Sequence, residues 1–211
     1  EILAILGAKS RDNSRTPMQW SAAANAGFTE VYQSPQLAKL HPWAQEQAKI
    51  SGYRTVGVYL GPLGFGFNKE LLAKKKLAVP KSWADLLKPE YKGLIWLSNY
   101  NTAGTAKLVI NTMIQMKGHD EAMEYFKALD KNIAQYTKSG SAPAKALARG
   151  ETAIGITFLH DLLKETMAGM PVEVLAPCEG TGFEIGSMSI VKGARNLENA
   201  KKFYEFALRA D

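Results

Sequence analysis

Hydrophobic positions along the chain switch between two spacings, one typical of strands and one typical of helices. Apolar runs predict buried strands at residues 94–97, 152–161 and 185–191, and residues 53–68 form two strand-like runs divided at Gly61 and Pro62. Apolar positions at helical spacing predict helices near residues 34–50, 68–76, 82–88, 104–117, 118–131, 143–149 and 196–208. Because strands and helices alternate, we expect an α/β fold with a mostly parallel central sheet.

Turn and capping residues refine these boundaries. Pro42 falls inside the first helical pattern and predicts a kink or a break there, and Gly52 ends that helix. Ser82 and Asn196 precede two of the other helical patterns and are expected to cap them.

Two predicted helices begin in short runs of Thr, Ser and Gly. A helix start presents unpaired backbone N–H groups and the positive end of the helix dipole, so it favours an anionic ligand group. Most Ser-rich helix starts are plain caps, which remains the alternative interpretation. If the two starts converge, they could hold one anion. The candidate residues are Thr102, Gly104 and Thr105 at the first start, and Ser139, Gly140 and Ser141 at the second.

Polar side chains also follow two predicted strands. His160 and Asp161 end the apolar run that begins near residue 152, and Glu179 lies among glycines after the next strand. A carboxylate at the end of a buried strand needs a partner, and such groups suit the hydroxyls of a polyhydroxylated ligand. A single His is more often a core or surface residue, so only the His–Asp pair is informative here.

Composition excludes several other classes of protein. The net charge is +6, but the basic residues are scattered, and the run Lys74–Lys76 is best interpreted as a solvated helix face, so we expect no nucleic-acid partner. Cys178 is the only cysteine, which excludes an intramolecular disulfide and argues against a zinc site. No apolar stretch approaches the ~18 residues of a membrane-spanning helix, and the first residues lack the features of a signal peptide. We expect no metal, cofactor or catalytic residue.

The segments QYTKSGSAPAKALARGETAIGITFLHD and PVEVLAPCEGTGFEIGSMSIVKGARNLENAKKFYEFAL resemble the second half of a bacterial periplasmic substrate-binding protein of an ABC importer. The resemblance covers about residues 29–208, and the subgroup contains ferric-iron and hexose-phosphate binders. It implies a type II periplasmic-binding-protein fold of two lobes, with part of the first lobe missing. It also implies ligand capture in an interlobe cleft, a monomer, a periplasmic location and membrane permease subunits as partners.

The same resemblance implies a division of the chain. Residues 29–67 would form part of lobe 1 and the hinge, residues 68–177 would form lobe 2, and residues 178–211 would cross back and complete part of lobe 1. The glycines of residues 53–68 suit a hinge.

The ligand is the point on which members of such a family differ. Its iron binders hold the metal through two adjacent tyrosines, and no Tyr-Tyr pair exists in this sequence. His160, Asp161 and Glu179 are better suited to sugar hydroxyls, so a hexose phosphate is the expected ligand. An aminoalkylphosphonate, another organic anion or ferric iron is the alternative.

Residues 1–28 depart from this pattern. SRDNSRTPMQWSAAANAGFT resembles a segment of α-amylase-superfamily glucosidases, including trehalose-6-phosphate hydrolases. The barrel and the catalytic carboxylates of that family are absent, so we carry over no glycosidase activity. A fusion, a gene-assembly artefact and a mosaic sequence are the three possible origins of this segment. A non-functional chimeric fragment that carries a glucosidase-derived segment is the alternative to a working binding protein. The polar residues between Arg11 and Pro17 predict a loop.

Overall fold

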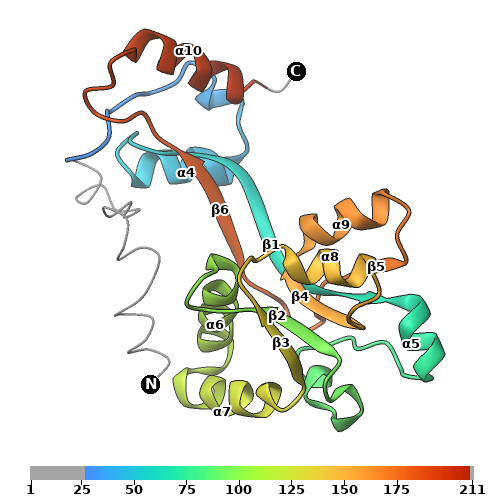
Figure 1. The fold of residues 1–211 in the computed structure, drawn as a ribbon. Helices are drawn as coiled ribbons and strands as arrows, with labels where there is room; N and C mark the ends of the chain where they lie inside the picture. The colour runs from blue at the N-terminus through green and yellow to red at the C-terminus, as the bar shows by residue number, and fades with distance from the viewer. Residues whose placement is uncertain (1–26, 210–211) are drawn as a thin grey trace. The chain divides into compact units, whose positions relative to one another are not determined.

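The computed structural model describes residues 27–209, which form two compact units. Unit 1 is Gly61–Phe183, and unit 2 combines residues 27–60 with residues 184–209. The long strand β1 (Val56–Asn68) and strand β6 (Phe183–Met188) each have residues in both units (Figure 1). The predicted loop between Arg11 and Pro17 lies outside the described residues.

Unit 1 contains most of the regular structure. Its strands besides β1 are β2 (Ile95–Ser98), β3 (Ile133–Thr137), β4 (Ile154–Phe158) and β5 (Val172–Leu175). Its helices are α5 (Lys69–Lys75), α6 (Gly104–Lys117), α7 (His119–Asp130), α8 (Ala142–Ala148) and α9 (Leu159–Met167), with 3-10 turns η2 (Ala84–Leu87) and η3 (Pro89–Tyr91).

The sheet is mixed rather than mostly parallel. The strand order is β3-β2-β4-β1-β5, and β6 pairs with β1. Strand β2 runs parallel to both β3 and β4, whereas β1 runs antiparallel to both β4 and β5. The expectation of a mostly parallel sheet was therefore wrong. The alternation of strands and helices does not fix the direction of β1, whose neighbours in the sheet come from residues about a hundred positions later.

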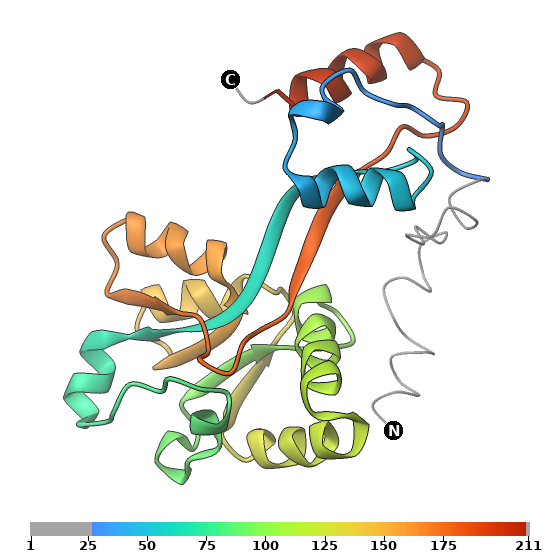
Figure 2. The same cartoon turned by 180° about the vertical axis from the view of Figure 1, so that it is seen from behind.

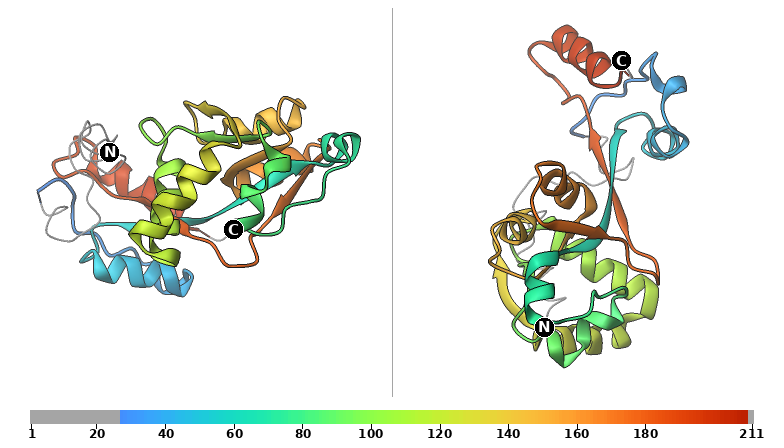
Figure 3. Two further views of the ribbon diagram at one scale, coloured as in Figure 1. Left: turned by 90° about the horizontal axis from the view of Figure 1, so that it is seen from below. Right: turned by 90° about the vertical axis from the view of Figure 1, so that its right-hand side faces the viewer.

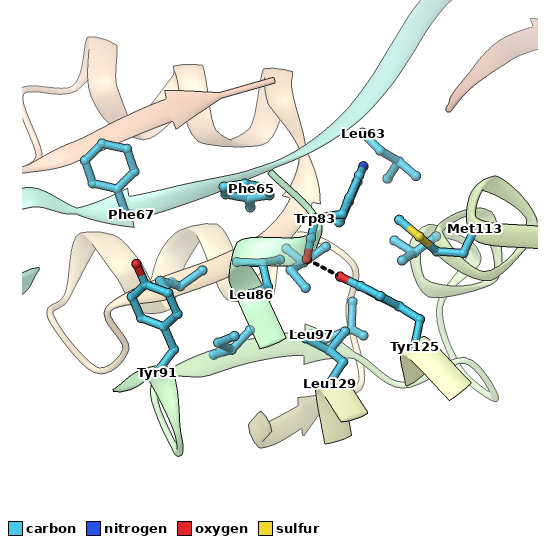
Figure 4. Packing of buried hydrophobic residues seen from close by; sticks show 14 of the residues in the cluster. Leu63, Phe65, Phe67, Trp83, Leu86, Tyr91, Leu97, Met113, Tyr125 and Leu129 are labelled. Carbon is cyan, nitrogen blue, oxygen red and sulfur yellow. Dashed lines mark hydrogen bonds between the residues drawn. The ribbon is translucent and has the colours of Figure 1, made fainter. Parts of the chain in front are cut away.

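Helices cover both faces of this sheet in unit 1. Helices α6 and α7 lie on one face and α8 and α9 on the other (Figure 2). The alternating sequence LGFGF within β1 explains how both faces of this strand can pack against helices. Leu63, Phe65 and Phe67 point to the α6–α7 side, where they join the large core with Trp83 and Met113 (Figure 4).

The intervening glycines of β1 face the opposite side of the sheet. A Cβ at Gly64 would overlap the Leu159 side chain, and one at Gly66 would overlap the Leu162 side chain, so α9 packs directly on the backbone of β1.

In the α6–α7 core, the Tyr125 hydroxyl donates to the Trp83 carbonyl oxygen at 2.9 Å (Figure 4).

Unit 2 has a smaller core of its own. It contains the 3-10 turn η1 (Leu37–Lys39), α4 (Pro42–Ile50) and α10 (Leu197–Ala207), together with parts of β1 and β6 (Figure 3). Val56, Ile190 and Tyr204 are buried together in that core. None of the helices in residues 27–209 is long and apolar enough to span a membrane.

Most predicted elements are present, but several of their details differ. Pro42 is the first residue of α4, so the break that it predicts is confirmed. The division predicted at Gly61 and Pro62 is wrong, because β1 is continuous there. Pro62 precedes the first paired position of β1 with β4, Leu63, so its missing N–H removes no bond from that ladder.

Two more differences concern helix starts. The Ser82 hydroxyl accepts a hydrogen bond from the Asp85 N–H at 2.9 Å, but the element that follows is a 3-10 turn rather than an α-helix, and its N-cap residue is Trp83. Asn196 is the N-cap residue of α10, as expected, but its side chain makes no capping hydrogen bond.

Candidate functional site

The carboxyl ends of three parallel strands define the candidate site within unit 1. Strands β3, β2 and β4 are adjacent and parallel, so their carboxyl ends share one edge of the sheet. Residues 99–103 join β2 to α6, residues 138–141 join β3 to α8, and β4 passes directly into α9. This edge is where ligands bind in open α/β sheets.

Thr102 ties the first two loops together. Its hydroxyl lies 2.9 Å from the Lys138 carbonyl oxygen and 3.3 Å from that of Asn99. The two sequence-predicted anion loops are therefore in direct contact, as the convergence of their helices requires.

Thr105 and Gly140 make a second contact between these loops. Thr105 is only 6% exposed, and a Cβ built on Gly140 would overlap the Thr105 hydroxyl oxygen. Glycine is needed at residue 140 because the backbone approaches a side chain closely, not because of its backbone angles. The neighbouring Ser139 and Ser141 hydroxyl oxygens lie 3.2 Å apart on the surface.

Thr157 of β4 connects the second loop to the start of α9. This residue is fully buried, and its hydroxyl lies 2.8 Å from the Gly140 carbonyl oxygen and 3.3 Å from Asp161 Oδ2. The sequence prediction did not include Thr157. The available signal was a polar residue inside the otherwise apolar strand IGITF.

His160 and Asp161 lie in the first turn of α9 rather than at the end of a strand, because β4 ends at Phe158. The His160 ring stacks on that of Phe158, with 5.1 Å between the ring centroids. His160 Nε2 lies 4.0 Å from Asp161 Oδ1, and both side chains are partly exposed. The strand prediction over residues 159–161 is wrong, but α9 begins at the same edge as the loops, and Thr157 lies within hydrogen-bond distance of both Gly140 and Asp161.

None of the three helices that begin at this edge has a side-chain cap. The N-cap residues are Ala103 for α6, Ser141 for α8 and Phe158 for α9, and none of them makes a capping hydrogen bond through its side chain. The backbone N–H groups of these first turns therefore lack the side-chain acceptor that commonly satisfies them. The first turn of α6 contains no acidic residue, whereas Asp161 lies in that of α9.

Glu179 belongs to a different set of contacts. One carboxylate oxygen accepts from the Trp83 N–H at 2.8 Å and the other from the Ala84 N–H at 3.1 Å. Its carboxylate thus caps the 3-10 turn η2, which supplies the partners that the sequence argument assigned to a ligand. The structure brings the other eight predicted residues to one edge but places Glu179 against η2.

Comparison with known proteins shows which protein family this chain belongs to. The family model for bacterial extracellular solute-binding proteins matches residues 12–211. The chain belongs to this family. The resemblance inferred from the sequence is therefore confirmed.

Among residues 27–209, no group of three or more His, Cys, Asp or Glu side chains is placed to hold a metal ion.

Several relatives of this solute-binding protein are closely similar. The periplasmic binding protein AfuA from Actinobacillus pleuropneumoniae, solved with exogenous fructose 6-phosphate bound, is 42% identical with a TM-score of 0.83 over 99% of this chain and 67% of that chain. The periplasmic binding protein P5PA is 39% identical with a TM-score of 0.81 over 90% of this chain and 60% of its own. An uncharacterised Haemophilus influenzae protein is 45% identical over 88% of this chain and 54% of its own length.

A short stretch matches a different family. Trehalose-6-phosphate hydrolase of Escherichia coli is 79% identical over 29 residues, which is 14% of this chain and 5% of that enzyme. This match confirms the second resemblance and its small extent. The solute-binding chain spans only about half the length of the curated Haemophilus relative.

Proposed function

We propose that this protein is the solute-binding component of an ABC importer and captures a hexose phosphate at the edge formed by β2, β3 and β4. The observation that carries the proposal is the meeting of three helix starts without side-chain caps at that edge. Such donors suit a phosphate, which carries negative charge and accepts several hydrogen bonds. AfuA, which is 42% identical, was solved with fructose 6-phosphate.

The site offers different groups to the two parts of such a ligand. The start of α6, together with the Ser139 and Ser141 hydroxyls, would receive the phosphate. Asp161 and His160 would receive sugar hydroxyls, because a carboxylate accepts hydrogen bonds and an imidazole can donate or accept. Asp161 carries negative charge, so the phosphate is placed at α6 rather than at α9. Glu179 is left out of this assignment because both its oxygens already accept backbone hydrogen bonds.

The remaining parts of the proposal follow from the family. The protein would act in the periplasm as a monomer, deliver its ligand to membrane permease subunits and perform no chemistry on it. The absence of adjacent tyrosines in the sequence argues against ferric iron. An aminoalkylphosphonate remains the second candidate ligand, since it also carries an anionic phosphorus group.

Calorimetric titration of the 211-residue chain with fructose 6-phosphate and with fructose tests the proposal. We expect the phosphate ester to bind far more tightly, because without it the helix N–H groups have no ligand partner. Asp161→Asn should weaken binding of the ester about tenfold to a hundredfold, the scale of a hydrogen bond to a charged group.

Glu198→Gln is the matched control, since Glu198 lies in the first turn of α10 in unit 2 and pairs only with Lys201 among the described residues. This variant should bind the ester as tightly as the unmodified chain. Equal affinity for fructose and its phosphate would contradict the proposal, as would Asp161→Asn binding normally.

A further inference from the structure

A cavity lies in unit 1, beside strand β3. Its volume is about 310 Å³, at the lower end of the range for small-molecule pockets. Leu97, Ala106 and Ile110 contribute apolar wall from β2 and α6. None of the nine predicted ligand residues lines it, so this cavity is distinct from the candidate site described above.

Three aromatic rings from three different segments surround this cavity. Tyr100 comes from the loop after β2, Phe126 from α7 and Tyr136 from β3. The Tyr136 ring is on the same side of the sheet as Leu97, because these two residues are partners in the parallel ladder. The faces of aromatic rings carry partial negative charge and attract cations.

Two of these rings are held by further contacts. The Tyr136 hydroxyl donates to Asp130 Oδ1 at 2.6 Å, and burial together with this bond raises the pKa of Tyr136, so the phenol stays neutral. The Phe126 ring packs edge-on against Tyr125 at a centroid distance of 5.6 Å. An arrangement that is already held in place loses little entropy when a ligand binds.

The charges at the cavity favour a cation over an anion. Asp130 lines it, and among the described residues its second carboxylate oxygen has no hydrogen-bond or ion-pair partner. Lys127 also lines it, but the Lys127 ammonium bonds Glu124 at 2.6 Å, which offsets its charge. The carboxylate is therefore the charge that is free to meet a ligand.

We propose that this cavity is a second ligand site that binds a small organic cation, a quaternary ammonium or an alkylamine, between the rings of Tyr100, Phe126 and Tyr136 and the carboxylate of Asp130. The site does not depend on the proposed capture of a hexose phosphate. It shares Asn99 and Tyr100 of the loop 99–103, and Ala106 in the first turn of α6, with that site.

Titration of the 211-residue chain with acetylcholine tests this site, with backbone amide shifts in NMR spectra as the readout. The uncharged isostere of acetylcholine, 3,3-dimethylbutyl acetate, has nearly the same shape without the positive charge and is titrated for comparison. We expect saturable binding of acetylcholine, at least about tenfold tighter than that of the isostere, with shifts centred on residues 97–100, 126–130 and 136. The net charge of +6 disfavours non-specific attraction of a cation, so saturation reports a local site.

Two substitutions with a matched control locate the binding. Asp130→Asn removes the charge but keeps an acceptor for Tyr136, and Tyr136→Leu removes one ring. Each should weaken acetylcholine binding about fivefold to thirtyfold. Asp120→Asn is the control, because Asp120 lies in the first turn of the same helix and its side chain is fully exposed.

Equal binding of acetylcholine and its isostere would overturn the proposal, since the cavity would then be an apolar pocket only. Absence of saturation, or normal binding by both Asp130→Asn and Tyr136→Leu, would overturn it as well. Asp130 is exposed, so Asp130→Asn should fold normally and remains informative if Tyr136→Leu does not.

Discussion

Gly140 shows how a single residue sets the spacing of the two ligand loops. Gly140→Ala should lower the free energy of unfolding by about 1–3 kcal/mol, the usual cost of inserting a methyl group where no space exists. The added Cβ would overlap the Thr105 hydroxyl and force the two loops apart. Thermal or denaturant unfolding of the variant measures this directly.

Gly104→Ala is the matched control for stability. A Cβ at Gly104, the first residue of α6, meets no atom within 4 Å, and alanine restricts the unfolded chain more than glycine does. This variant should be as stable as the unmodified chain or slightly more so. If the two substitutions cost the same, the close packing of Gly140 on Thr105 is not a constraint.

Some features of single residues could be predicted from the sequence, and others could not. Thr102, Thr105 and Gly140 were predicted as parts of helix starts, from the residue types that helix starts prefer. The hydrogen bond from Thr102 to Lys138 and the role of Thr157 could not be predicted, because each depends on a contact between segments far apart in the sequence.

At the scale of elements, Glu179 tests whether a strand-end carboxylate belongs to a ligand or to a neighbouring turn. Glu179→Gln should destabilise the fold by about 1 kcal/mol, as the loss of a capping side chain does, because its carboxylate bonds the Trp83 and Ala84 N–H groups at the start of η2. Its affinity for fructose 6-phosphate should not change. Unfolding and calorimetry on the same variant separate the two roles.

Glu173→Gln serves as the control, since Glu173 is half exposed and its side chain has, within residues 27–209, only a long ion pair of 3.9 Å with Lys69. It should change neither stability nor affinity. A loss of affinity in Glu179→Gln without a loss of stability would show that Glu179 contacts the ligand, as the sequence alone predicted.

Helices and strands were predicted well where the spacing of apolar residues stays the same along the segment. They were predicted poorly where that spacing changes from one typical of strands to one typical of helices. Helices α6, α7 and α10 have long, regular apolar patterns and were found close to the expected bounds. The sequence predicts a strand that extends to Asp161, because an apolar run that ends abruptly in polar residues is typical of a central parallel strand. The helical signal there is the spacing of Leu159, Leu162 and Leu163, which becomes visible only when the window extends past Asp161.

For the whole molecule, the sequence is enough to identify the protein family, but it does not identify the ligand. The family model matches 12–211, and AfuA aligns with 99% of this chain. This chain nevertheless spans 54% of its Haemophilus relative and 67% of AfuA. The groups proposed to face the phosphate all belong to unit 1, where the three helix starts lie.

The most direct test of the central claim follows backbone amide shifts of the ¹⁵N-labelled 211-residue chain during titration with fructose 6-phosphate and with fructose. We expect the phosphate ester to shift the amides of residues 104–106 and 139–141 most strongly, because these N–H groups and the adjacent hydroxyls would receive the phosphate. Fructose at the same concentration should leave them nearly unchanged. Large shifts confined to other residues, or equal shifts with both compounds, would contradict the claim that the helix starts hold the anion.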